Sequence, residues 1–373
     1  MTAENRNYRI FISAAEPSGD MHSANLISAV KERCPEAEFS GLGGPGMAAA
    51  GCRLLATTTD RAAMIYNAFG KLAFFYDLIK KTARYIRENR VDLVIVCDSP
   101  AFNFHIAAAA KSCGVPVMFY VAPQLWAWAP WRIQKLRRCC DRLCCILPFE
   151  LEWFDSRGVD TDFVGNPLLD GVDDPGGNIR DYEGYDPNSA LVALMPGSRS
   201  AEIKSLWRPM QQTAVRLKQV YPGIRFVTVA VDTQKQEILE RARVADFESD
   251  YVLSDVYNTA KDCDLALVAS GSATLQLAAA GCPMVVMYQS SRLLWHLVGR
   301  WLINTPHLSL VNILAGRELV PEYMPYLPPT EAVAVSAISL LGDQCRLAAL
   351  NRELIRMTAP LAEINTAGRV ADI

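Results

Sequence analysis

Five small residues, Ser270-Gly271-Ser272-Ala273-Thr274, interrupt a long apolar run in the second half of the chain. Small side chains let a backbone come close to a phosphate group, whose oxygens bind hydroxyl and backbone N–H groups. Gln276 follows within one helical turn and would face the ribose side of a nucleotide bound there. These residue types in this order predict a phosphate-binding turn at the start of a helix.

A second candidate anion site, Gly197-Ser198-Arg199, also follows an apolar run and precedes a helical pattern. Backbone N–H groups at a helix N-terminus attract anions, and a guanidinium adds charge and several donors. The alternative is that Arg199 is a solvated surface residue. Two anion sites in one domain, one of them with an arginine, suit a nucleoside diphosphate.

Carboxylates follow two apolar runs in the first half of the chain. Asp98 follows "LVIVC"; a carboxylate at a strand end with few cations nearby has a raised pKa and can act as a general base. Its alternative role is that of a helix cap or turn residue. Glu16 and Asp20 flank a Ser-Gly turn that opens a helix, which Ser18 or Asp20 would cap. A cap accounts for one polar residue there and not for two carboxylates.

Two further motifs have open interpretations. Trp126, Trp128 and Trp131 lie within six residues, either in the core or at a rim that contacts a sugar or an acyl chain. The stretch "GLGGPG" (41–46) has the spacing of a dinucleotide-binding loop, the only feature that favours an oxidoreductase. It follows a second, shorter strand and contains a proline, so we favour a tight structural turn.

The helices and strands that carry these residues follow a repeating sequence pattern. Continuous apolar runs alternate with helical stretches, which predicts α/β layers with parallel sheets. The runs expected to be strands are 8–15, 92–98, 116–122, 142–148, 190–197, 224–231, 265–270 and 283–288. We expect two Rossmann-like domains and a cleft between them, divided into 1–170, a Gly/Pro/Asp-rich linker 171–189, 190–345 and a C-terminal helical segment 346–373 that packs back on the first domain. Ligands bind such sheets at the carboxyl ends of strands.

Composition excludes other classes. A formal net charge of −3 gives no reason to expect a nucleic-acid partner. The first ten residues lack the apolar core of a signal peptide, so we expect reduced cysteines. The pairs in "RCCDRLCC" do not have zinc spacing, and we predict no metal site. Residues 265–291 are apolar enough to span a bilayer, but Gly and Pro divide them into a strand, a short helix and a strand.

Nine segments, in the same order as in one known family, resemble lipid-A-disaccharide synthases. They cover nearly the entire chain and are "AAEPSGDMHSANLISAVK", "FSGLGGPGMAAAG", "CDSPAFNF", "YVAPQLWAW", "ILPFELEWF", "FVGNPLLD", "MPGSRSAEI", "SGSATLQLA" and "LSLVNILAGRELVPE". The resemblance implies a GT-B glycosyltransferase that needs no cofactor. It would transfer diacylglucosamine from UDP-diacylglucosamine to a phosphorylated glycolipid acceptor with inversion, releasing UDP.

The resemblance also implies roles for individual residues. Asp98 is the candidate base, Glu16 lies near the acceptor, and Arg199 contacts the diphosphate. Residues expected at the acceptor or its lipid chains are Ser18, Asp20, Asn103, Trp126, Trp128, Phe74, Phe75 and Asn312. The aromatic stretch 64–81 matches a region that touches membrane, with a buried helix face as its alternative. We therefore expect a monomer or homodimer on the cytoplasmic surface of the inner membrane.

The chain departs from the family pattern at several positions. The family's glutamate in the small-residue turn is Gln276, and a glutamine cannot accept from two ribose hydroxyls as a carboxylate does. Other positions that differ are Pro17, Ala68, Ala129, Asn166 and Val311. The alternatives are therefore a UDP-sugar epimerase, a transferase acting on another lipid, and a non-catalytic protein that binds a nucleotide sugar or lipid.

Overall fold

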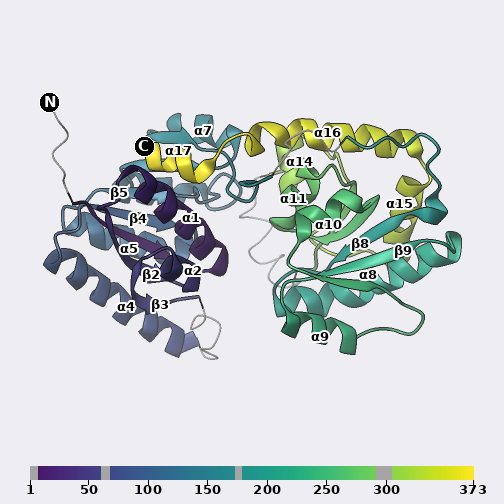
Figure 1. Ribbon diagram of the computed structural model, residues 1–373, viewed down its shortest axis with the longest axis horizontal. Coiled ribbons are helices and arrows are strands. Elements are labelled where there is room, and N and C mark those ends of the chain that lie inside the picture. Colours follow the sequence, from purple (N-terminus) through teal and green to yellow (C-terminus); the bar gives the residue numbers. More distant parts are fainter. Residues whose placement is uncertain (1–6, 60–67, 173–178, 291–304) are drawn as a thin grey trace. The chain divides into compact units, whose positions relative to one another are not determined.

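The computed structural model describes residues 7–59, 68–172, 179–290 and 305–373, with side chains from residue 74 onward in the second range. The chain forms two compact units (Figure 1). The first comprises Met1–Asp170 and Ile364–Ile373, and the second comprises Gly171–Glu363. Each unit is an α/β sandwich around one parallel sheet, as the apolar runs predict.

The first unit contains a seven-stranded sheet in the order β3-β2-β1-β4-β5-β6-β7. Its strands are β1 (Arg9–Ala14), β2 (Glu38–Gly43), β3 (Arg53–Thr57), β4 (Leu93–Cys97), β5 (Val117–Tyr120), β6 (Arg142–Cys145) and β7 (Thr161–Phe163). Its helices are α1 (Pro17–Arg33), α2 (Pro45–Ala49), α4 (Ala68–Glu88), α5 (Pro100–Ser112), α6 (Ile133–Cys139), α7 (Pro148–Asp155) and α17 (Thr366–Asp372). All neighbouring strands pair in parallel.

Both faces of this sheet are covered. Successive strand side chains point to opposite faces. Phe11 and Val96 accordingly pack with α4, α5 and α6, whereas Ile12 and Cys97 pack with α1, α2 and α17. This two-sided burial explains why the strand sequences are continuously apolar. Cys144 and Cys145 belong to the two different clusters, so their thiols lie on opposite faces and serve as small apolar side chains.

The second unit contains a six-stranded sheet in the order β10-β9-β8-β11-β12-β13. Its strands are β8 (Leu191–Met195), β9 (Arg225–Ala230), β10 (Asp250–Leu253), β11 (Leu265–Ala269), β12 (Met284–Met287) and β13 (Glu322–Tyr323). Its helices are α8 (Ser200–Val220), α9 (Thr233–Arg241), α10 (Val256–Asp262), α11 (Ala273–Ala279), α14 (Leu310–Ala315), α15 (Thr330–Leu341) and α16 (Gln344–Ala362).

The last two helices belong to different units. The final segment expected from the sequence, 346–373, is divided, because α16 stays with the second unit and α17 joins the first. There α17 packs against α1 (Figure 1). Asp170 accepts hydrogen bonds from the N–H groups of Thr366 (3.0 Å) and Ala367 (3.4 Å), which fixes the start of α17.

The apolar run after residue 264 folds as β11, α11 and β12, as its Gly and Pro residues predict. Among the described residues no single helix is long and apolar enough to cross a membrane. One consecutive pair, Thr330–Leu341 with Gln344–Asp372, meets the length and composition criteria together but is bent by 91°.

Candidate active site

The residues predicted as the base and as the diphosphate site follow the strands at which the order of each sheet reverses. In the first unit β1 is flanked by β2 and β4, and Ala14 pairs with Cys97. Glu16 and Asp98 therefore follow two adjacent strands. In the second unit β8 and β11 are the corresponding neighbours, and they lead into Gly197 and Ser270. Open α/β sheets bind ligands at this kind of crossover.

The turn before α8 is built around Glu202. The Arg199 N–H donates to Glu202 Oε2 (3.1 Å), and Arg199 Nη1 lies 3.1 Å from Glu202 Oε1. Gly197 has φ +97°, and an added Cβ would collide with the same carboxylate. The Arg199 side chain is 73% exposed, so both its predicted role and its surface alternative fit this geometry. Among the described residues its guanidinium bonds only Glu202, so further N–H groups face away from the protein's own acceptors.

A second cation lies at this helix start. Lys235, on α9, donates from Nζ to the Ser200 hydroxyl (2.8 Å). Sequence reasoning missed Lys235, because 35 residues separate the two partners. The positive end of the α8 dipole, Arg199 and Lys235 together favour an anion, and Glu202 offsets part of that charge.

The turn between β11 and α11 is open. Gly271 and Ser272 are exposed, and an added Cβ on Gly271 would meet no atom within 4 Å. Thr274 is buried and its hydroxyl donates to the Gly271 carbonyl (2.7 Å), which shapes the turn. Gln276 is half-buried on α11. In the described part of the chain no packing requires a glycine at 271, so close approach by a ligand is its best explanation.

Asp98 occupies a tightly held position in the first unit. It is half-buried, has φ +51°, and donates its N–H to the Tyr120 carbonyl (3.1 Å). The adjacent Cys97 is not a nucleophile, because burial and the Asp98 charge raise the pKa of its thiol far above the ordinary value. Of these two neighbours at the end of β4, Asp98 is thus the one whose side chain can act as a base.

Glu16 and Ser18 are exposed at the start of α1, where a ligand has access to them. The expected capping of this helix by Ser18 or Asp20 is wrong: Glu16 occupies the N-cap without a side-chain cap, and Pro17 is the first helical residue. Proline at this position already lacks the N–H that a cap would satisfy.

Asp20 holds the glycine-rich turn instead. Its carboxylate accepts N–H groups from Gly44 (2.7 Å), Gly46 (2.9 Å) and Met47 (3.1 Å). An added Cβ on Gly44 or Gly46 would lie 2.7 or 2.9 Å from Asp20 Oδ2. The structural interpretation of residues 41–46 is therefore confirmed. Asp20 is 5% exposed and faces the protein, which argues against its predicted contact with the acceptor.

The three tryptophans divide between the two interpretations. Trp126 is 7% exposed and donates from Nε1 to Glu150 (2.8 Å), so it is a core residue and not the predicted acceptor contact. Burial raises the pKa of Glu150 to about 7. Hydrogen bonds from Trp126, Leu147 and Ile146 favour the ionised form and so oppose this shift in part. Trp128 and Trp131 are 45% and 62% exposed, as rim residues would be.

Phe74 and Phe75 pack towards the protein. Both belong to the cluster beneath α4, and the Phe75 ring centroid lies 5.0 Å from that of Phe102. Both rings are half-buried and pack against that cluster, which favours the buried-face alternative over their assignment to lipid contact. Residues 64–67 of the predicted membrane stretch lie outside the described part of the chain, and the side chains of residues 68–73 are not described.

Two asparagines predicted to bind the acceptor form hydrogen bonds within the protein instead. Asn312 lies in the second unit; its amide donates to Val320 O and Glu322 (both 3.0 Å) and accepts from Leu319 and Val320 N–H. Asn103 is fully buried between β1 and β4. Neither amide is available to a ligand.

Comparison of the sequence with known families and proteins gives one consistent family. A sequence profile described as lipid-A-disaccharide synthetase matches residues 10–355. The lipid-A-disaccharide synthase of Geobacter metallireducens is 33% identical over 98% of this chain and 96% of its own. That of Myxococcus xanthus is 33% identical over the same shares. The chain belongs to the lipid-A-disaccharide synthase family. Its members are hexosyltransferases, and this chain is an enzyme of that type.

Solved structures confirm the expected GT-B fold. A putative UDP-N-acetylglucosamine 2-epimerase from Listeria monocytogenes superposes with a TM-score of 0.66 at 10% identity, over 98% of this chain and 95% of that one. MurG from Acinetobacter baumannii gives 0.57 at 15% identity, over 98% of both chains. At such identities the likeness concerns the fold alone.

The positions at which this synthase-family chain departs from the family pattern have different surroundings. Ala129 is buried with φ +58°, and Val311 is buried in the core of the second unit. Asn166 is buried after β7; its Oδ1 accepts from the Leu168 N–H (3.1 Å), while Nδ2 has no partner among the described residues. Ala68 begins α4, and its side chain is not described. Of these positions, Gln276 is the one beside the open turn.

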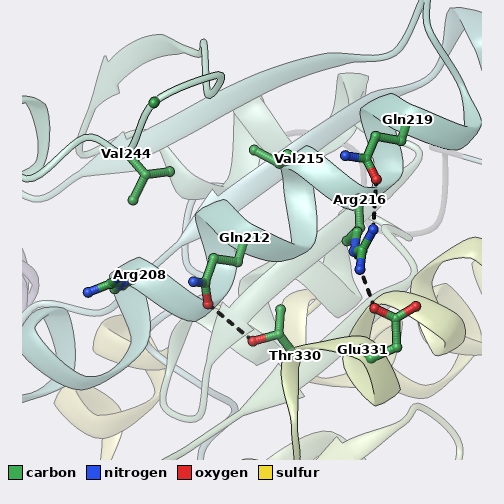
Figure 2. A pocket seen from close by; sticks show the side chains of 9 residues that line it. Arg208, Gln212, Val215, Arg216, Gln219, Val244, Thr330 and Glu331 are labelled. Carbon is green, nitrogen blue, oxygen red and sulfur yellow. Dashed lines mark hydrogen bonds and ion pairs between the residues drawn. The ribbon is translucent and has the colours of Figure 1, made fainter.

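A separate pocket of about 550 Å³ lies along α8 and the start of α15 (Figure 2). Arg216 bridges Glu331 (3.2 Å) and Gln219 (2.9 Å) there, and Thr330 donates to Gln212 (3.3 Å). None of the predicted site residues lines it, and its charged groups largely satisfy one another. The residues predicted to bind the nucleotide and to act as the base therefore lie at the strand crossovers and not at this pocket.

Proposed function

We propose that this protein transfers 2,3-diacylglucosamine from its UDP conjugate to 2,3-diacylglucosamine 1-phosphate. The products are the β-1,6-linked lipid A disaccharide 1-phosphate and UDP. The observation that carries the proposal is the division of groups between the two crossovers. At the first crossover stands Asp98, whose backbone N–H and carbonyl are both hydrogen-bonded. At the second stand an open small-residue turn after β11 and, after β8, a helix start with Arg199 and Lys235.

In the proposed reaction Asp98 accepts the proton of the acceptor's 6-hydroxyl group as that oxygen attacks the anomeric carbon. The bond from this carbon to the diphosphate breaks, and its electron pair leaves with UDP. Attack from the face opposite the diphosphate inverts the anomeric centre. A positioned base of this kind contributes about 10²–10⁴-fold to the rate.

The second unit would stabilise the departing diphosphate. The open Gly271 turn gives the phosphates access to backbone N–H groups, while the α8 N-terminus, Arg199 and Lys235 supply positive charge. Charge that develops on the leaving oxygen is best stabilised by donors fixed in advance. No metal ion is needed for this step, because arginine, lysine and helix-terminal N–H groups supply the charge.

Mass spectrometry of the products tests the function directly. Purified protein with UDP-diacylglucosamine and its 1-phosphate acceptor should yield the disaccharide and UDP, whereas Asp98→Asn should lose at least about 100-fold in turnover at nearly unchanged UDP affinity. A UDP-sugar epimerised without consumption of acceptor would support the epimerase alternative. UDP binding without any product would support the binding-protein alternative.

Arg199→Ala tests the donor half separately. Charge-assisted contacts are worth about 1.5–3 kcal/mol, so UDP binding should weaken by roughly 10- to 150-fold. Calorimetry that gives unchanged affinity would make Arg199 a solvated surface residue.

We also propose that the protein lies on the cytoplasmic surface of the inner membrane. Supporting this, Tyr76 is exposed on α4, and Trp128 and Trp131 are exposed at the turn before α6. Exposed basic residues on α4 and α6 are Lys80, Lys81, Arg84, Arg87, Lys135, Arg137 and Arg138. Interfacial aromatics and basic clusters favour anionic lipid surfaces.

Sedimentation with anionic vesicles tests this placement. Trp128→Ser with Trp131→Ser should release the protein from vesicles and leave its melting temperature nearly unchanged, since both rings are exposed. Phe74→Ser with Phe75→Ser is the matched control and should lower the melting temperature instead, because these rings are packed. Vesicle binding that survives the tryptophan changes would overturn the proposed contact.

A further inference from the structure

Asn103 joins the ends of the two strands that flank the crossover in the first unit. It belongs to α5, is fully buried, and accepts from the Ser13 hydroxyl through Oδ1 (2.8 Å). Its Nδ2 donates to the carbonyl groups of Asp98 (2.7 Å), Cys97 (2.9 Å) and Ser13 (3.3 Å). One amide thus connects β1, β4 and the residue proposed as the base.

The backbone at this point has an unusual conformation. Asp98 and Ser99 have φ values of +51° and +45°, so two consecutive non-glycine residues are left-handed. Such residues cost free energy and persist where their surroundings over-determine them, often at functional sites. Here the Asp98 N–H is held by Tyr120 O and the Asp98 carbonyl by Asn103. Both sides of the residue are therefore fixed.

We propose that Asn103, held in turn by Ser13, is a positioning residue that keeps Asp98 in its left-handed conformation and so aims the carboxylate at the acceptor hydroxyl. The inference rests on the proposed role of Asp98 as the base. The sign of φ decides the direction in which the Cα–Cβ bond leaves the backbone. If the peptide after Asp98 relaxed to an extended conformation, the carboxylate would point elsewhere while the sheet stayed intact.

Positioning Asp98 is a different role from contacting the acceptor, the role that the family resemblance implied for Asn103. An acceptor-binding amide would be exposed, and its loss would raise the KM for the acceptor. A positioning amide acts on the chemical step. Misplacing a catalytic group by about 1 Å costs on the order of 100-fold in rate, so its loss should lower kcat with little change in KM.

Asn103→Leu keeps a similar volume, adds no charge and removes every bond of the amide. We expect kcat to fall about 100-fold while the acceptor KM and UDP affinity stay within about twofold. Ser13→Ala is the milder companion, because it leaves the Nδ2 donors in place; kcat should fall by roughly three- to tenfold. If Asn103→Leu fails to fold, Ser13→Ala carries the same test.

A double-mutant cycle decides whether Asn103 acts through Asp98. Residues that act as a unit are non-additive, so replacing Asn103 in an Asp98→Asn background should cost less than about twofold further. Asn351→Leu is the matched control. It removes another fully buried amide, which donates to Gly281 O (2.8 Å) in the second unit, and its effect on kcat should be the same in both backgrounds.

The outcomes separate the two proposals. If Asn103→Leu lowers kcat by the same factor in the wild-type and Asp98→Asn backgrounds, or raises the acceptor KM alone, positioning is overturned while the function stands. If Asp98→Asn is as active as wild type, Asp98 is not the base and the positioning role falls with it. If the wild-type protein makes no disaccharide, the proposed function fails first.

Discussion

Each unit has a turn rich in small residues at the end of a strand, 41–46 in the first and 270–274 in the second. The two turns contain small residues for different structural reasons. In the first unit Gly44 and Gly46 face the Asp20 carboxylate, which takes three backbone N–H groups. In the second unit an added Cβ on Gly271 would meet nothing. The first turn is filled from within by the protein. The second leaves its backbone open to a ligand.

A glycine-rich turn after a strand can have either of these two causes. A glycine-rich spacing alone does not identify a phosphate site, because an internal carboxylate satisfies the same N–H groups that a phosphate would. What distinguishes the two cases is whether a partner inside the protein already occupies the space. Residues 41–46 match a nucleotide-binding pattern, yet their N–H groups are taken, whereas Ser270–Thr274 match none as closely and remain accessible.

Removing the internal partner should have the largest effect. Asp20→Ala leaves the buried N–H groups of Gly44 and Met47 and the half-buried N–H of Gly46 without an acceptor. Each buried group left in this way costs about 1–3 kcal/mol. We expect urea denaturation to show a loss of at least about 3 kcal/mol. Gln276→Ala, beside the open turn, should cost less than about 1 kcal/mol. Similar losses for both variants would mean that the two turns do not differ as described.

His22, on the same helix as Asp20, should make the stability of the first unit sensitive to acid. Burial lowers the pKa of His22 from 6.5 to about 4, although the Asp170 charge partly opposes this. Between pH 6.5 and pH 4 His22 is therefore protonated in the unfolded chain and neutral in the folded protein. The free energy of unfolding should fall by up to about 3 kcal/mol as the pH drops from 6.5 towards 4. His22→Asn should flatten this slope in unfolding measurements. An unchanged slope would place the acid sensitivity elsewhere.

A methyl group added to each turn gives the most direct contrast. Gly271→Ala meets open space, so its melting temperature should stay within about 2 °C of wild type while UDP binding weakens by about tenfold, or ~1.4 kcal/mol. Gly44→Ala collides with Asp20 and Thr59, so it should lower the melting temperature and leave UDP affinity of the folded protein unchanged. Full UDP affinity in Gly271→Ala would remove the turn from the donor site.

The smallest effect should come from Gln276. A glutamate would accept from both ribose hydroxyls, so Gln276→Glu should tighten UDP binding by about 1 kcal/mol, the size of one improved hydrogen bond. If the surroundings have adapted to an amide, a poorly paired carboxylate would cost affinity instead. Calorimetric titration of UDP into both proteins gives the sign, and equal or weaker binding contradicts the expectation.

The main strands were predictable because two-sided burial leaves a clear apolar signal. Each of the eight predicted runs contains a strand near its expected limits. The sequence analysis did not identify β3, β7, β10 and β13. These lie at or near the ends of the sheets, and β7 and β13 have only three and two residues. Short strands with partly exposed side chains resemble loops in sequence.

The location of the site was predictable, but the use of each polar residue was not. Strand ends place Asp98, Arg199 and the small-residue turn at the crossovers. Asp20 and Asn103 occur in the same segments and look equally available. Their partners lie 24–27 and up to 90 residues away, so only the fold reveals that these side chains are satisfied inside the protein.

The placement of α17 has a consequence for the order of synthesis. The ribosome makes residues 1–170 first, yet the helix that completes this unit follows the whole of Gly171–Glu363. Until then the surface that Val370 covers is exposed, and Asp170 and Arg33 lack their partners Thr366 and Asp372. Domains usually fold as they emerge. Here the first unit is completed only when its last helix has been made, and until then a chaperone would have an apolar surface to protect.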